Sequence, residues 1–207
     1  MGLLDKFRAK TNPTGVWQAE PAAGTEIDFD FDTHSLCGIK LGDSVALLWK
    51  LGPPEDQAQF RQGAFACYSR GFQAEAVNGV IVCFSLFWNQ RQHHPFAEFA
   101  GVCRYRGQVL PLKAGTSEPG IRKFFGEPYW RDEDEDEVLL FYEFKNLEWQ
   151  IEIGRREGLT TILALTPPLM AERKQRDAYK VTKPWPPPGE GWQSPRHLSP
   201  VSRRETT

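Results

Sequence analysis

A segment of this sequence recurs once, and the internal repeat constrains the fold more than any other feature. Lys40–Ser44 (KLGDS) resembles Lys113–Ser117 (KAGTS), and Leu51–Pro54 (LGPP) resembles Phe125–Pro128 (FGEP). Both motifs recur after almost the same number of residues, so one inserted residue is enough to align the two copies. A chain with such a period is built from copies of one supersecondary unit.

Each copy predicts a short helix between its two motifs. Asp43 and Thr116 follow a glycine and precede apolar residues at helical spacing, where a side-chain oxygen caps the free amide groups of the first turn. Gly52 and Gly126 come at the other end, where a residue with positive φ ends a helix at little cost, and the prolines that follow prevent its continuation. We therefore expect one short helix in each copy.

Strand-like segments lie on both sides of each helix. They alternate apolar and polar residues and are joined by short polar turns, which is typical of antiparallel hairpins. Asn78-Gly79 is the strongest of these turn signals, and residues 71–79 are expected to form a turn region. The expected strands are 26–31, 36–40, 63–69 and 80–88 in the first copy, and 99–105, 108–112, 138–144, 147–153 and 159–165 in the second.

The pattern predicts the α+β class, with two tandem units of a short helix packed on an antiparallel sheet. The expected divisions are an N-terminal extension (1–25), a first unit (26–92), a second unit (93–168) and a basic, proline-rich and largely disordered tail (169–207).

The helix start and the helix end followed by an antiparallel sheet resemble the unit of the small outer-membrane-assembly lipoproteins of the SmpA/OmlA type. In tandem, the same unit is similar to beta-lactamase inhibitor protein. The likeness rests on Lys40–Pro54 and Lys113–Pro128. The resemblance implies a sheet face that grips another protein without catalysis.

Charge is distributed unevenly along the chain. Eight basic and four acidic residues from Ala171 onward give the tail a net charge of +4, and because the whole chain carries −2, the preceding body carries −6. Phosphate binding depends on clustered Lys and Arg, so we do not expect the folded body to bind nucleic acid.

The remaining composition indicates a cytoplasmic protein without a cofactor or metal. Met1–Arg8 lacks the apolar core of a secretory signal and a lipobox cysteine, and no apolar run is long enough for a membrane helix. The four cysteines are widely spaced and form no zinc motif, so we expect reduced, structural thiols at Cys37, Cys67, Cys83 and Cys103.

An unbroken acidic run in the second copy is the most conspicuous local feature. Such a run suits a solvated mobile loop or a patch that meets a basic partner, whereas its lack of glycines and neutral ligands argues against a calcium loop. Tyr129 and Trp130 directly precede it and are expected to be exposed, as interface anchors often are. The predicted partner-binding residues are Tyr129, Trp130, Asp132, Glu133, Asp134, Glu135, Asp136 and Glu137.

The tail contains Pro184, Trp185 and Pro187 in the run KPWPPP, which favours an extended conformation and prevents a packed core. These residues are candidates for binding an aromatic groove. A tether, or a disordered end whose Trp185 and Trp192 fold back on the body, is the alternative interpretation.

No catalytic motif is recognisable, so we expect a non-enzymatic protein-binding module that blocks or escorts a partner, as an inhibitor or bacterial immunity protein does. Its partner would be another protein, and a basic one would suit the acidic run; the oligomeric state stays open. The alternatives are a structural subunit anchored by its tail, and a ligand-binding or hydrolytic protein with a site between the units that uses His93, His94 or the acidic run. Trp149 is expected in the core, and His34 in a polar turn.

Overall fold

The computed structural model describes residues 26–88 and 95–187, and within them the same order of elements occurs twice: a hairpin, a helix and an antiparallel meander. The α+β class predicted from the sequence is confirmed. The first unit comprises β1 (Asp28–Asp30), β2 (Ser35–Leu36), β3 (Ile39–Lys40), η2 (Val45–Leu51), α1 (Gln57–Phe60), β4 (Ala64–Cys67), η3 (Tyr68–Arg70), β5 (Phe72–Val77) and β6 (Val80–Phe87).

The second unit has one additional strand, β9, between its helix and its meander, and it is followed by two short helices. Its elements are β7 (Val102–Tyr105), β8 (Gln108–Leu110), α2 (Glu118–Phe125), β9 (Trp130–Glu133), β10 (Glu137–Glu143), β11 (Glu148–Gly154), β12 (Gly158–Leu165), η4 (Leu169–Ala171) and α3 (Arg173–Ala178).

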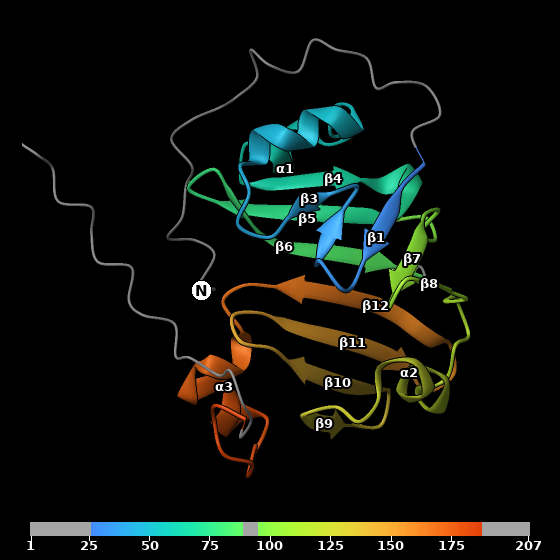
Figure 1. Cartoon of the computed structure of the whole chain (residues 1–207), viewed down its shortest axis with the longest axis vertical. Coiled ribbons are helices and arrows are strands. Elements are labelled where there is room, and N and C mark those ends of the chain that lie inside the picture. Colours follow the sequence, from blue (N-terminus) through green and yellow to red (C-terminus); the bar gives the residue numbers. More distant parts are fainter. Residues whose placement is uncertain (1–25, 89–94, 188–207) are drawn as a thin grey trace, which may run out of the picture.

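The two units share both of their sheets. The meanders join edge to edge through β6 and β12 into a seven-stranded antiparallel sheet with the order β4-β5-β6-β12-β11-β10-β9 (Figure 1). The hairpins join through β1 and β7, which are parallel, into a five-stranded sheet with the order β3-β2-β1-β7-β8. Both junctions between the units therefore consist of hydrogen-bonded strands.

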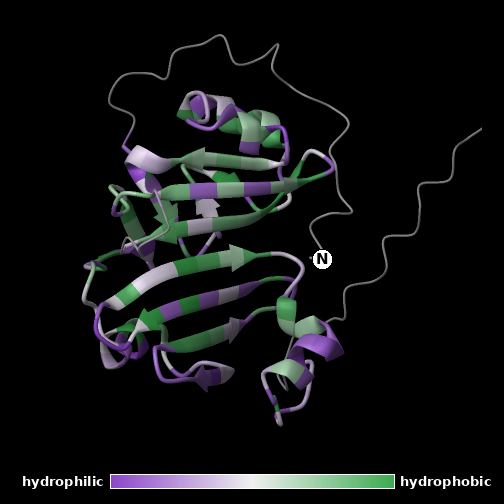
Figure 2. Ribbon diagram, turned by 180° about the vertical axis from the view of Figure 1, so that it is seen from behind, coloured by the Kyte–Doolittle hydropathy of each residue, from purple (hydrophilic) through white to green (hydrophobic). Residues whose placement is uncertain are grey.

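One apolar core lies between these sheets. Ring contacts connect them, with Phe29 of β1 placed 6.0 Å from Phe84 of β6 and Phe31 placed 5.0 Å from Trp149 of β11. Phe125 of α2 lies 5.3 Å from Trp149, so this helix covers the same face. Trp149 is 1% exposed, which confirms its predicted place in the core. Figure 2 shows the apolar residues along the central strands and hydrophilic residues on β9 and α3.

The turn before each helix is built in the same way, although not as predicted. The N-caps are Ser44 and Ser117 rather than Asp43 and Thr116. Asp43 Oδ2 instead accepts a hydrogen bond from a backbone N–H three residues earlier, at 2.8 Å, and Thr116 Oγ1 does the same at 3.2 Å. Their side chains therefore close the preceding turn, which leaves the next serine at the helix start.

The predicted helix ends are confirmed. Gly52 has φ 90° and Gly126 has φ 81°, which are values that a side chain disfavours, and the N–H of Gly126 closes α2 on the carbonyl of Arg122 at 2.8 Å. The first helix, η2, is a 3-10 helix rather than an α-helix.

The expectation of a turn region at 71–79 is wrong over most of its length. Phe72–Val77 forms β5, which pairs with β4 and β6. Phe72 and Ala74 are buried, and this alternation with Gln73 was too weakly apolar to predict a strand. The turn itself is confirmed at Asn78-Gly79, where both residues have positive φ.

The expectation of a largely disordered tail from residue 169 is wrong for residues 169–187. η4 and α3 pack on the second unit, where Met170 is fully buried and Tyr179 lies 5.0 Å from the ring of Phe141. Phe141 alternates along β10 with Tyr142, whose ring contacts Trp149, so this segment covers the sheet face opposite the core. The remaining tail prediction concerns residues 188–207, which lie outside the described residues.

Candidate functional site

The structure gathers the predicted partner-binding residues at one edge of the seven-stranded sheet. Trp130–Glu133 forms β9, which is the last strand of the sheet and pairs only with β10. Asp134, Glu135 and Asp136 make the turn, and Glu137 begins β10. We call Asp132–Glu137 the acidic hairpin.

The acidic hairpin is an ordered turn, which argues against a mobile loop. Asp134 Oδ1 accepts hydrogen bonds from the backbone N–H groups of Asp136 at 2.8 Å and Glu137 at 2.9 Å. A short Asp side chain often stabilises a turn in this way. The side chains of Glu135 and Asp136 are exposed to solvent.

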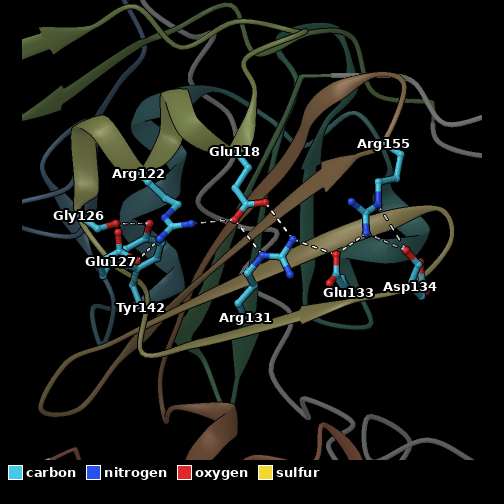
Figure 3. A network of polar contacts seen from close by, with 9 residues as sticks. All are labelled: Glu118, Arg122, Gly126, Glu127, Arg131, Glu133, Asp134, Tyr142 and Arg155. Carbon is cyan, nitrogen blue, oxygen red and sulfur yellow. Dashed lines mark hydrogen bonds and ion pairs between the residues drawn. The ribbon is translucent and has the colours of Figure 1, made fainter.

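Part of the acidic charge is neutralised by a ladder of ion pairs (Figure 3). Arg131 lies between Glu118 of α2 and Glu133, at 2.9 Å from each, and Arg155 pairs with Glu133 from the other side. Hydrogen bonds from Arg131 and then Arg155 lower the pKa of Glu133 to about 2. The acidic hairpin therefore offers charge mainly at its turn.

Tyr129 and Trp130 were predicted to be exposed, but the C-terminal segment covers them. The Tyr129 hydroxyl donates to the carbonyl oxygens of Lys183 at 3.2 Å and Pro184 at 3.0 Å. Trp130 Nε1 donates to the carbonyl of Tyr179 at 3.1 Å. Both side chains are half-buried. No local signal in the sequence indicates this burial, because the contacting residues lie far apart in the chain.

The tail residues singled out in the sequence meet the same surface. Trp185 is half-buried and lies edge-on to Tyr129, with ring centroids 6.0 Å apart, and the Arg176 guanidinium lies 5.9 Å from the Trp185 ring. Pro184 is exposed and contributes its carbonyl, whereas Pro187 is half-buried. The interpretation in which Trp185 folds back on the body fits this arrangement.

A hollow of about 310 Å³ opens beside Tyr129, and Pro187 lies at its rim. The lining is mainly aromatic, and Glu127 and Glu143 also contribute to it. We call this feature the aromatic hollow; its aromatic residues are Tyr105, Phe125, Tyr129, Tyr142, Phe144 and Trp149.

A pair of carboxyl groups lies under the C-terminal segment next to this site, and sequence reasoning missed it. Glu143 of β10 is directly opposite Glu148 of β11. Glu148 is fully buried and accepts a hydrogen bond from the N–H of Met170 at 2.9 Å, whereas neither oxygen of Glu143 accepts one from the described residues. Burial, and then the adjacent Glu148, raise the pKa of Glu143 well above its usual range.

The chemistry of this pair follows from its protonation. The raised pKa leaves Glu143 protonated at neutral pH, and a protonated carboxyl beside a second carboxyl is an arrangement that acid–base chemistry can use. Both oxygens of Glu143 are enclosed by protein, however, and Glu148 lies beneath η4. The pair therefore cannot reach a substrate in this conformation.

The histidines have separate outcomes. His34 lies in a turn with φ 52°, as predicted, but its Nδ1 also accepts a hydrogen bond from Trp149 Nε1 at 3.1 Å. Burial lowers the pKa of His34, which is consistent with a neutral, accepting imidazole. His93 and His94 lie outside the described residues.

Within the described ranges, no group of three or more His, Cys, Asp or Glu side chains is arranged to hold a metal ion. The four cysteines are free thiols, and three of them are buried, as expected. None of the described helices is both long enough and apolar enough to cross a bilayer.

Comparisons with known proteins assign no family. No protein-family model matches the sequence, and no curated protein matches it. One similar solved structure is a DUF4309 family protein, YjgB, from Bacillus subtilis subsp. subtilis str. 168, with 12% identity, a TM-score of 0.43 and coverage of 63% of this chain and 84% of that chain. At such low similarity nothing about this chain follows from the neighbour.

Proposed function

We propose that this chain is a non-enzymatic protein-binding module whose binding surface is the outer edge of the second unit. The surface consists of the acidic hairpin, Tyr129 and the aromatic hollow. It fits the role expected from the sequence, in which the protein blocks or escorts a partner as an inhibitor or immunity protein does.

The observation that carries the proposal is that Tyr129 and Trp130 donate hydrogen bonds to backbone carbonyls. Their side-chain donors bind three backbone carbonyls of the C-terminal segment, at Tyr179, Lys183 and Pro184. Aromatic rings with a polar tip that bind main-chain carbonyls are typical of peptide-recognition surfaces. This surface thus already holds a polypeptide segment of the same chain.

The charge of the surface favours a basic partner. Glu135 and Asp136 are exposed at the tip of the acidic hairpin, and the turn that holds them is fixed by Asp134. Exposed charge of this kind steers association and selects partners more than it strengthens binding. A partner with Lys or Arg facing the tip and an apolar side chain facing Tyr129 would use both halves of the surface.

Site-specific photo-crosslinking in the native host tests the proposal. A photoreactive residue at Glu135 should crosslink the full chain to one protein in near-stoichiometric yield. The matched control is the same residue at Val109, which is 57% exposed on β8 of the five-stranded sheet. Equal crosslinking at both positions, or none at Glu135, would refute a binding surface at this edge.

A further inference from the structure

The segment Lys183–Pro187 contacts the body in a way that suits proline-rich sequences in general. Proline has no backbone N–H, so a proline-rich segment offers mainly carbonyl acceptors and flat apolar rings. The Tyr129 hydroxyl binds two successive carbonyls, at Lys183 and Pro184, and the Trp185 ring lies against the Tyr129 ring. These contacts require no N–H group from the segment.

The aromatic hollow stays open with this segment in place. Pro187 contributes to one side, whereas the other walls come from residues such as Tyr105, Phe144 and Trp149, and about 310 Å³ stays open between them. Ligand pockets have volumes of roughly 300–1,000 Å³. The open volume is thus sufficient for an additional apolar side chain.

Charge indicates which proline-rich sequences fit. The Lys183 ammonium lies 5.8 Å from the centre of the Tyr129 ring, a cation–π distance, and Glu127 is among the residues around the hollow. The tail carries +4 and the body −6. A peptide with a Lys or Arg just before its prolines therefore matches the surface.

We propose that Tyr129 and the aromatic hollow form a receptor site for a basic, proline-rich segment of a partner protein, and that Lys183–Pro187 is its intramolecular competitor. This inference rests on the proposed function and names the chemistry of the partner. A tethered competitor has an effective concentration on the order of mM, so a free peptide binds the intact chain only weakly. Weakening the resident segment should reveal the site.

The test uses a fluorescent peptide of residues 181–187 (VTKPWPP) and fluorescence anisotropy on the full chain. Trp185→Ala in the chain removes the ring that rests on Tyr129, so the peptide should bind this variant about tenfold more tightly than the wild type. Pro187→Ala is a second variant with the same expected direction. Val109→Ala, on the opposite sheet, should leave the affinity unchanged.

Two further measurements assign the binding to this site. Adding Tyr129→Phe to the Trp185→Ala chain deletes the donor to the carbonyls and should weaken peptide binding about fivefold, as expected for the loss of a hydrogen bond. A peptide with alanine at Pro184, Pro186 and Pro187 should bind at least tenfold more weakly than the original. Near-ultraviolet circular dichroism checks that each variant keeps its tertiary structure.

Several outcomes would overturn the proposal. They are equal affinity for both peptides, no effect of Tyr129→Phe, or no gain from either Trp185→Ala or Pro187→Ala. Concentration-dependent dimers in sedimentation, dissolved by the peptide, would make a second copy the occupant and also overturn it. Crosslinking at Glu135 without peptide binding would sink this inference alone, whereas peptide binding without crosslinking would sink the proposed function at the acidic hairpin.

Discussion

Glutamine at position 143 should stabilise the protein at neutral pH, because the wild-type fold must take up a proton there. Glu143 is enclosed, faces Glu148 and has its pKa raised well above the ordinary value of 4.5. The folded state therefore holds a proton at pH 7 that the unfolded chain has released. A glutamine has nearly the same shape, and its amide can donate to Glu148 without any proton uptake.

The magnitude depends only on the unfolded-state pKa, as long as the folded-state pKa stays above 7. The ordinary pKa of 4.5 lies two and a half pH units below pH 7. At 1.36 kcal/mol per unit, the proton uptake on folding costs about 3 kcal/mol. The native state binds one proton more than the unfolded state over this range. The free energy of unfolding of the wild type therefore falls as pH rises, by about 1.4 kcal/mol per unit.

Urea unfolding followed by tryptophan fluorescence at pH 4, 5, 6, 7 and 8 measures this difference. Glu143→Gln should match the wild type at pH 4 and exceed its stability by about 3 kcal/mol at pH 7. Glu135→Gln makes the same substitution at an exposed position and should show no such trend. A Glu143→Gln chain that gains nothing at pH 7, or gains equally at every pH, would refute the protonated pair.

Three other changes probe the fold and the ion-pair ladder. Gly71 and Gly107 both have φ 69°, but only at Gly71 would a Cβ meet a backbone oxygen, at 2.5 Å; Gly71→Ala should therefore lower the melting temperature clearly more than Gly107→Ala, and equal losses would contradict the clash. Arg131→Ala should raise the pKa of Glu133 from about 2 toward its ordinary range in an NMR titration, while changing stability by less than about 1 kcal/mol because both side chains of the pair reach solvent. Trp149→Phe should cost about 2–4 kcal/mol in urea unfolding, because it loses both a hydrogen bond and core volume; a loss below 1 kcal/mol would show that the core repacks.

Local chemistry predicted the frame of this fold well. Gly52 and Gly126 ended their helices as expected, and Asn78-Gly79 turned the chain, because these residue types adopt a positive φ that others avoid. The strands of the second unit other than β9 were equally visible, since alternation such as that of Leu147–Ile153 places Trp149 on a buried face. Each of these signals is contained within a few neighbouring residues.

The candidate site was less predictable, because it depends on contacts between distant segments. Alternation placed Glu148 on the face opposite Trp149, and that face was expected to be polar. Only the return of Leu169–Ala171 over β11 buries Glu148, through the N–H of Met170. The burial of Tyr129 likewise depends on where the C-terminal segment lies, which the local sequence does not indicate. The one available signal was the pairing of an acidic body with a basic, aromatic tail.

The two outer edges of the shared sheet are covered differently, which explains why we place the proposed binding surface on the second unit. At the first edge, α1 packs on β4, and its N-cap residue Asp56 also accepts a hydrogen bond from the Tyr68 hydroxyl at 3.0 Å, so local contacts cover that edge. At the second edge, β9 takes the place between helix and meander that α1 has in the first unit, and the cover comes from Tyr179 and Lys183–Pro187 instead. The contacts of this cover with Tyr129 and Trp130 include side-chain hydrogen bonds and ring contacts, so we expect that another segment can replace it without unfolding the sheet. The duplication supplies the shared frame, and the proposed binding surface lies at the edge whose cover comes from a distant segment of the chain.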